Sequence, residues 1–153
     1  MFLCKLLTIS LFVLQCKNMK EDMQYDQFGI HLMVDGYGAS RESLKDADAL
    51  KRMLAEIPVS MGMHTISDPL VVEVGPKNRK DPGGLSGFVM IAESHLSFHT
   101  FPDRGFVTID LYTCQDELNV EKLLELFKEA FKLQGFDHYV QKRGLHYPSA
   151  NIY

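Results

Sequence analysis

Two stretches of the chain carry apolar residues at the three- and four-residue spacing of an amphipathic helix. Each follows a residue whose side chain can cap a helix N-terminus, and each precedes a residue that ends helices. The spacing therefore predicts two helices, each with one buried face. They are expected at residues 47–57, between Asp46 and Pro58, and at residues 120–131, between Asn119 and Gly135.

Short apolar or β-branched runs bounded by turn residues lie around these helices, which is typical of strands. Strands are expected at residues 28–34, 69–74, 87–92, 95–101, 105–112 and 136–141, with turns at residues 35–38 and 75–84. The order β-α-β-β-β-β-α-β favours an α/β fold, a two-layer sandwich in which two helices cover one face of a largely antiparallel sheet. The other face must meet solvent or a partner, and its apolar residues favour a homodimer.

Length and composition are those of one globular domain. The chain has 153 residues, of which 46% are hydrophobic and 24% charged, and its formal net charge is -4. This charge and the lack of a basic stripe argue against nucleic-acid binding, and we expect no membrane partner. The three cysteines are odd in number and include no CxxC pair, so a reducing, cytoplasmic setting is expected rather than a disulfide framework.

The first 18 residues differ from the body of the chain. Residues 6–14 form an apolar run about as long as a signal-peptide core and too short to span a bilayer. Gln15 is larger than the residue expected before a lipoprotein cysteine at position 16. We expect residues 1–18 to be an extension upstream of a start at Met19, and residues 19–153 to be the single domain. If residues 1–18 are a genuine signal, the protein is exported or tethered to a membrane.

Reactive side chains are concentrated at residues 93–99, which contain one carboxylate, two hydroxyls and two imidazoles. Polar groups at that density must be hydrogen-bonded, exposed or chemically used. Three interpretations are open from the residues alone: zinc binding by His95 and His99 with Cys114, nucleophilic catalysis by Ser94 or Cys114, and a polar sheet edge without a chemical role. The histidines have no carboxylate between them in the metalloprotease manner, and Ser94 lacks a Gly-x-Ser-x-Gly elbow.

A longer motif changes the balance. The chain resembles the core of the prokaryotic S-adenosylmethionine decarboxylases, pyruvoyl enzymes that make their own cofactor, in Glu93-Ser94-His95-Leu96-Ser97-Phe98-His99-Thr100-Phe101-Pro102, Gly105-Phe106 and Asp110-Leu111-Tyr112-Thr113-Cys114. The layout agrees over residues 28–140, and the agreement is tight over residues 85–114.

This resemblance implies that the chain cleaves itself between Glu93 and Ser94. The Ser94 hydroxyl attacks the Glu93 carbonyl and turns the amide into an ester, and loss of the Ser94 α-proton then expels the Glu93 carboxylate. Rearrangement and loss of ammonia leave a pyruvoyl group that caps residues 95–153, and no metal is implied. His99 matches the family's processing base, and Ser86 matches the serine that assists processing.

The implied reaction is decarboxylation of S-adenosylmethionine for polyamine (spermidine) biosynthesis. The pyruvoyl carbonyl forms a Schiff base with the substrate amine, and its adjacent amide carbonyl takes the electrons released with carbon dioxide. Cys114 matches the family's proton donor, a role that needs the thiol protonated. The expected partners are a cationic small-molecule amine and a second copy, in a homodimer of cleaved two-chain protomers.

Substrate recognition follows the family less closely. Residues 77–82 hold no aromatic residue on which an adenine could stack, and Phe101-Pro102-Asp103 replaces the family's Trp-Pro-Glu. The end of the first strand lacks the acidic residue usually found after its tyrosine. The substrate-binding positions expected are Asp103, Phe101 and Asp35.

Other functions stay open as alternatives. One keeps the chemistry and changes the substrate to a basic amino acid, arginine or ornithine, which the loss of an adenine stack would fit. Another is a non-catalytic relative that acts as a binding or partner subunit, and a third is the zinc hydrolase. The sequence assigns no role to His95, Ser97 or residues 142–148, and it leaves dependence on an activator open.

The cleavage assignment carries a geometric condition. Ser86 and Ser94 are eight residues apart, which in a continuous strand separates them by about 26 Å. Both can act in cleavage only if the chain folds back near the Glu93–Ser94 bond. A hairpin-like reversal is therefore predicted at the cleavage site, and an unbroken strand over residues 86–99 would contradict the assignment.

Overall fold

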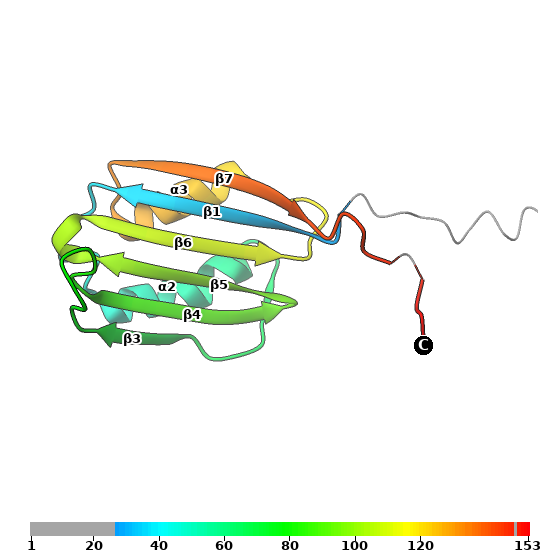
Figure 1. Cartoon of the computed structure of the whole chain (residues 1–153), viewed down its shortest axis with the longest axis horizontal. Helices are drawn as coiled ribbons and strands as arrows, with labels where there is room; N and C mark the ends of the chain where they lie inside the picture. The colour runs from blue at the N-terminus through cyan, green and yellow to red at the C-terminus, as the bar shows by residue number, and fades with distance from the viewer. Residues whose placement is uncertain (1–26, 149) are drawn as a thin grey trace, which may run out of the picture.

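The protein forms two layers, a seven-stranded sheet and two helices that lie behind it in Figure 1. This computed structural model describes residues 27–148 and 150–153, so the expected extension at residues 1–18 lies outside the described residues. The elements are β1 (Gly29–Tyr37), α2 (Ala47–Ser60), β2 (His64–Thr65), β3 (Leu70–Val74), β4 (Gly84–Ala92), β5 (Ser94–Phe101), the 3-10 turn η1 (Pro102–Arg104), β6 (Phe106–Thr113), α3 (Val120–Phe131) and β7 (Gly135–Arg143).

All strand pairings are antiparallel, and the strand order is β2-β4-β5-β6-β1-β7, with β3 beside the first half of β4. The predicted α/β two-layer sandwich is thus confirmed. The pattern of apolar and polar residues did not predict the two-residue strand β2, because two residues are too few to show an alternation. None of the helices in the described part of the chain is long and apolar enough to cross a membrane.

Side chains that alternate along the strands build the core between sheet and helices. Leu32 and Leu96 from the sheet and Phe127 from α3 are completely buried there. Phe98 meets Phe131 of α3 edge-to-face, with ring centroids 5.5 Å apart. The Phe98 ring covers Gly87 of β4, where any Cβ atom would overlap it, so the glycine after Ser86 is a packing requirement.

Several boundaries differ from the prediction. Both predicted N-caps are present, since Asp46 and Asn119 accept backbone hydrogen bonds from the first turns of their helices. Helix α2 runs past Pro58 to Ser60. Proline lacks an N–H donor, but its carbonyl can still accept a hydrogen bond, and the Pro58 carbonyl accepts one from the Met61 amide. Helix α3 ends before the expected Gly135, since Lys132 takes a left-handed conformation with φ 55°.

The first strand is also longer than expected. The predicted turn at residues 35–38 is strand as far as Tyr37, because β1 pairs with β6 on one side and with β7 on the other. Hydrogen bonds on both edges hold Gly36 in the sheet although glycine is a weak strand former.

The sheet face opposite the helices, which we call the open face, carries both polar and apolar side chains. Ser86, His99 and Asp35 lie on it. They belong to one row of cross-strand partners that also includes Thr108 of β6, and their neighbours along each strand point into the core. Large apolar side chains are exposed on it as well, among them Phe88 and Met90 in β4 and three residues of β3: Leu70, Val72 and Val74. An exposed apolar surface of this kind is typical of an interface.

Candidate active site

The expected cleavage site lies in a tight turn. Strand β4 ends at Ala92, Glu93 forms the turn, and β5 begins at Ser94. The chain reverses there at one end of the sheet, where the β4 arrow ends in Figure 1. The reversal predicted between residues 86 and 99 is confirmed, and it leaves Glu93 exposed.

Cys114 reaches the carbonyl of the expected scissile bond. It directly follows β6, whose Tyr112 pairs with His95, so the end of β6 lies beside the start of β5. The Cys114 thiol donates a hydrogen bond of 2.9 Å to the Glu93 carbonyl oxygen. The Ser94 Oγ atom is buried and has no hydrogen-bond partner among the described residues. A buried hydroxyl without a partner is uncommon and retains its lone pairs for attack.

The surroundings of Cys114 favour the neutral thiol. Burial raises the pKa of Cys114 above its ordinary value, the Tyr112 phenol opposes the rise, and the Glu93 carboxylate adds to it. The thiol therefore keeps its proton at neutral pH, as a proton donor must.

Ser86 and His99 form the second polar pair of the site. They are direct cross-strand partners, and the Ser86 hydroxyl lies 2.9 Å from His99 Nδ1. Ser94 instead pairs with Ile91, five positions further along β4. Five residues of strand span about 16 Å, so the hairpin does not bring Ser86 and His99 close to Ser94 of the same chain.

An aromatic pocket lies at the opposite end of the sheet from the turn. The rings of Phe101 and Phe106 stack with centroids 5.7 Å apart, and Tyr37 continues the stack at 5.4 Å from Phe106. The two phenylalanines line a pocket of about 380 Å³ together with residues of the β3–β4 loop: Lys77, Asn78, Lys80 and Asp81, and with Arg104.

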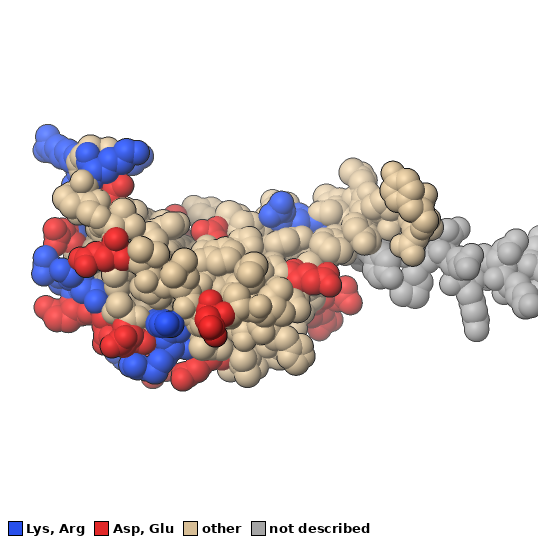
Figure 2. Space-filling model, turned by 90° about the horizontal axis from the view of Figure 1, so that it is seen from below, with Lys and Arg blue, Asp and Glu red and all other residues tan. Residues whose placement is uncertain are grey.

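The β3–β4 loop, residues 75–83, is held against η1. Arg104 donates a hydrogen bond of 2.8 Å to the Arg79 carbonyl, and Asn78 Oδ1 accepts from the backbone of Lys80 and Asp81. Figure 2 shows Lys and Arg side chains projecting at the end of the molecule where Figure 1 places this loop. The pocket thus combines an aromatic floor with a cationic rim.

The two predicted acidic binding residues have different surroundings. Asp103 is paired with Arg41 at 2.8 Å, and this hydrogen bond lowers the pKa of Asp103. Its carboxylate is therefore already partly neutralised. Asp35 lies on the open face between Thr108 and Asp137, and it shares a transverse row with His99.

Comparison with known proteins agrees with this geometry. The sequence model of the family described as S-adenosylmethionine decarboxylase matches residues 30–144. The chain is 34% identical over 117 residues to the S-adenosylmethionine decarboxylase proenzyme of Archaeoglobus fulgidus, an alignment that covers 76% of this chain and 97% of the relative. The proenzyme of Brevibacillus brevis is 34% identical over 110 residues, 72% of this chain and 77% of the relative. The chain belongs to the S-adenosylmethionine decarboxylase family.

A solved structure supports the same assignment. The crystal structure of the adenosylmethionine decarboxylase from Aquifex aeolicus superposes with a TM-score of 0.68 at 25% identity, covering 82% of this chain and 98% of that one. The predicted family and fold are thus confirmed, and the chain is a member of a decarboxylase family whose curated relatives are named as proenzymes.

The residues at the turn fit a pyruvoyl group made from Ser94. Such a group would require the Ser94 Oγ atom as nucleophile, and that atom is buried without a hydrogen-bond partner among the described residues, next to the Glu93 carbonyl that accepts from Cys114. In residues 27–148 and 150–153, no three His, Cys, Asp or Glu side chains are grouped to hold a metal ion. His95, His99 and Cys114 therefore do not form the zinc site considered from the sequence.

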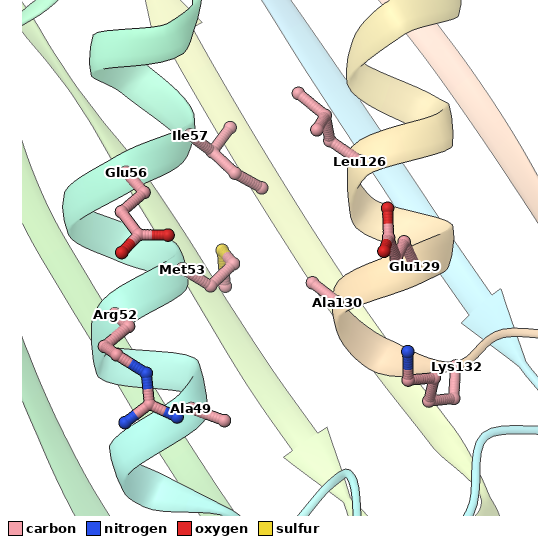
Figure 3. A pocket seen from close by; sticks show the side chains of 9 residues that line it. All are labelled: Ala49, Arg52, Met53, Glu56, Ile57, Leu126, Glu129, Ala130 and Lys132. Atoms are coloured by element: carbon pink, nitrogen blue, oxygen red, sulfur yellow. The ribbon is translucent and has the colours of Figure 1, made fainter.

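A groove between the two helices is remote from this chemistry. Figure 3 shows it between α2 and α3, with Met53, Ile57 and Leu126 pointing toward each other and charged side chains at its margins. The helices lie behind the sheet in Figure 1, whereas Ser86 and His99 are on the open face. The groove contains none of the predicted site residues.

The pattern missed several residues that the fold adds to the site. Phe106 and Tyr37 complete the aromatic stack on Phe101, and Tyr112 lies in one cross-strand row with His95 and His31. Tyr112 was already part of the family-like motif, but only the register of β5, β6 and β1 shows which open-face residues are neighbours.

Proposed function

We propose that this protein is a self-processing, pyruvoyl-dependent decarboxylase of S-adenosylmethionine that serves spermidine synthesis in the cytoplasm. The observation that carries the proposal is the hydrogen bond of 2.9 Å from Cys114 to the Glu93 carbonyl, beside the buried and unpartnered Ser94 hydroxyl. The names of the relatives support the substrate, since they are called S-adenosylmethionine decarboxylase proenzymes.

Self-cleavage follows from the chemistry of the turn. Attack of Ser94 Oγ on the Glu93 carbonyl carbon closes a five-membered ring and places negative charge on the carbonyl oxygen. The Cys114 thiol already donates to that oxygen, so it stabilises the charge as it develops. Collapse of the ring breaks the C–N bond and gives the ester, and removal of the Ser94 α-proton by a base then releases the Glu93 carboxylate. The dehydroalanine left at position 94 rearranges to an imine, which water hydrolyses to the pyruvoyl group with loss of ammonia.

The finished enzyme retains the same thiol for its own reaction. The pyruvoyl group supplies an electron sink for the electrons released with carbon dioxide. Cys114 then gives its proton to the substrate carbon that has lost the carboxylate. Its raised pKa keeps that proton available at neutral pH.

The separation of Ser86 and His99 from Ser94 supports a homodimer with a shared site. A pair about 16 Å from the scissile bond of its own chain cannot act on it, but a second copy docked on the open face can present its own pair. The exposed apolar side chains of β3 and β4 on that face, including Phe88 and Met90, provide the contact surface. We therefore assign Ser86 and His99 to processing of the partner chain.

Intact-mass analysis of the purified protein tests the self-processing proposal. We expect two fragments that meet between Glu93 and Ser94, with the C-terminal fragment blocked to Edman degradation by its pyruvoyl end. Ser94→Ala should leave the chain whole and inactive, because it removes the nucleophile and the cofactor precursor. A wild-type chain that stays whole under all conditions would contradict the proposal.

A mixed dimer tests whether His99 acts on the other chain. We expect His99→Ala and Ser94→Ala chains to stay whole as separate homodimers. In the mixed dimer, the His99→Ala chain has an intact Ser94 and faces the partner's His99, so mass analysis should show that this chain alone is cleaved. The matched control pairs it with a Ser94→Ala/His99→Ala chain, where no cleavage is expected. Two whole chains in the first mixture would exclude action in trans.

The substrate is tested on processed enzyme. We expect carbon dioxide release from S-adenosylmethionine and none from arginine or ornithine. Release from either amino acid alone would keep the chemistry and replace the proposed substrate. Cleavage without decarboxylation of any of the three would point to a relative that acts only as a binding or partner subunit.

A further inference from the structure

The aromatic pocket at the end of the open face away from the turn is built on three rings in one row. The register pairs Phe101 of β5 with Phe106 of β6, and Phe106 with Tyr37 of β1. The ring centroids are 5.7 Å apart in the first pair and 5.4 Å apart in the second. Interplanar angles of 27° and 31° make the rings nearly parallel, an arrangement that a further flat ring can extend.

The rim of this pocket has an excess of positive charge. Lys77, Lys80 and Arg104 line it with a single carboxylate, that of Asp81, so the lining has a net charge of +2. The Asp81 carboxylate accepts a hydrogen bond of 3.1 Å from the Gly83 amide of its own loop. In residues 27–148 and 150–153, no carboxylate lies within ion-pairing distance of either lysine.

The other acidic residue at this end of the molecule does not balance the rim. Asp103 is paired with Arg41 at 2.8 Å, and both residues line a different cavity, on the other side of η1 from the phenylalanines. Asp137, which lies beyond the aromatic row, accepts a hydrogen bond of 3.1 Å from the Tyr37 hydroxyl. The positive charge of the rim is therefore available to a ligand.

Hydrogen bonds hold the rim in one arrangement. The backbone amides of Lys77 and Asn78 both donate to the Asp81 carbonyl, at 3.0 and 3.2 Å, and so close the loop on itself. Arg104 donates one of its five N–H groups to the Arg79 carbonyl, at 2.8 Å, which leaves the others for a ligand. A site whose groups are already placed loses less entropy when it binds.

Parallel rings beside unpaired cations favour a ligand that is flat at one end and anionic at the other. Nucleic-acid bases stack on aromatic side chains, and ammonium and guanidinium groups bind phosphate oxygens. A phosphate monoester has a charge of about −2 at neutral pH, which matches the rim better than the single charge of a carboxylate. The pocket volume of about 380 Å³ is within the range of sites for small molecules.

We propose that this pocket binds a nucleoside monophosphate, with the base stacked on the two phenylalanines and the phosphate held by Lys77, Lys80 and Arg104. The inference goes beyond the proposed function, because neither self-cleavage nor decarboxylation requires an anionic ligand. S-adenosylmethionine suits this rim less well, since its sulfonium and ammonium groups outnumber its one carboxylate. The pocket is thus a second ligand site of the open face.

Calorimetric titration of the full-length Ser94→Ala protein with adenosine monophosphate (AMP) tests the proposal. This protein stays whole, so the result does not depend on self-cleavage. At low ionic strength we expect AMP to bind at least roughly tenfold more tightly than adenosine or inorganic phosphate, and added salt to weaken it. AMP that binds no better than adenosine would show that the rim contributes nothing, and AMP that binds no better than phosphate would show the same of the rings. Either result would overturn the proposal.

Variants assign the binding to the pocket. Lys80 is exposed in its loop, so Lys80→Gln keeps the fold and should weaken AMP binding about tenfold through loss of one charged contact. Phe106→Leu keeps the lining apolar and should weaken AMP binding without changing the affinity for phosphate. Lys128→Gln, on the exposed face of α3, is the matched control and should bind AMP like the parent protein. Equal AMP affinities for Lys80→Gln and Lys128→Gln would place the ligand elsewhere and overturn the proposal.

The outcome is separable from that of the proposed function. A wild-type chain that cleaves itself and releases carbon dioxide, but whose Ser94→Ala form does not bind AMP, removes only the nucleotide site. A wild-type chain that never cleaves, but whose Ser94→Ala form binds AMP through Lys80, removes only the proposed function.

Discussion

Cys114 is proposed to serve two reactions with one sulfur atom. In the precursor its thiol donates to the Glu93 carbonyl, and in the processed enzyme it is proposed to donate its proton to carbon. The first task needs only a hydrogen-bond donor, whereas the second needs a group acidic enough to give its proton away. Burial raises the pKa of Cys114, so the thiol is neutral at neutral pH and decarboxylation should be lost as the pH rises through that raised pKa.

Substitutions of Cys114 separate the two tasks. We expect Cys114→Ser to cleave at nearly the wild-type rate, because its hydroxyl still donates to the Glu93 oxygen, and to decarboxylate poorly, because a hydroxyl is a far weaker acid. Cys114→Ala should cleave more slowly, by roughly tenfold, since the hydrogen bond is lost. Mass spectrometry over time measures cleavage, and carbon dioxide release measures turnover. A fully active Cys114→Ala enzyme would contradict the proton-donor assignment.

Single residues of the binding region were only partly predictable. Phe101 was expected to contact substrate, and it does line the aromatic pocket. Asp103 was expected to bind substrate through its carboxylate, and in the structure this carboxylate pairs with Arg41, 62 positions away in the sequence. A sequence gives no sign of such a pair, because both side chains are exposed and charged, and such residues are common on surfaces.

At the scale of elements, the β4–β5 hairpin decides what the motif residues can do. Its turn at Glu93 sets the register that pairs Ser86 with His99 and Ile91 with Ser94. The alternation of side chains along each strand could be predicted, since it has a period of two. The register between the strands could not, and a shift of one residue would move His99 to the core face. Gly87 helps to fix this register, because only glycine leaves space for the Phe98 ring.

The helices hold this sheet from one side, and their caps were predicted from the sequence. The side chain of Asp46 accepts a hydrogen bond of 2.9 Å from the Ala49 amide at the start of α2. Replacing Asp46 by Ala should lower the free energy of unfolding by about 1 kcal/mol, since one amide loses its partner. Chemical denaturation measures the change, and Lys51→Ala in the middle of the same helix should alter stability by much less. Equal losses for both variants would contradict the capping role.

At the scale of the whole molecule, the two ends of the open face have different chemistry. The turn with Glu93, Ser94 and Cys114 lies at one end, and the aromatic pocket lies at the other (Figure 1). A single chain therefore separates the proposed reaction centre from the proposed binding surface by most of the length of a strand. The proposed two-fold dimer, packed open face on open face, would bring the two regions together in two equivalent sites.

Charge on the open face tests this assembly. Phe88 is 41% exposed and lies on β4 beside Leu70 of β3. We expect Phe88→Asp to give a monomer in sedimentation velocity, and to abolish self-cleavage along with dimerisation, because an apolar contact is replaced by a charge that would have to be buried. Val59 is 58% exposed on the helix layer, so Val59→Asp should remain dimeric and cleaved. A cleaved Phe88→Asp monomer would contradict processing in trans.

The sequence by itself determined the layers and the helix caps and named the residues of the proposed reaction centre, because periodicity and capping are local and the motif is contiguous. The tertiary structure decided which of those residues meet. In the folded chain, Cys114 donates a hydrogen bond to the Glu93 carbonyl. Ser86 pairs with His99 at a distance from Ser94, and the Arg143 guanidinium lies over the Tyr112 ring. These contacts depend on the register of strands that are far apart in the chain, and that register follows from packing of the whole sheet rather than from any local pattern.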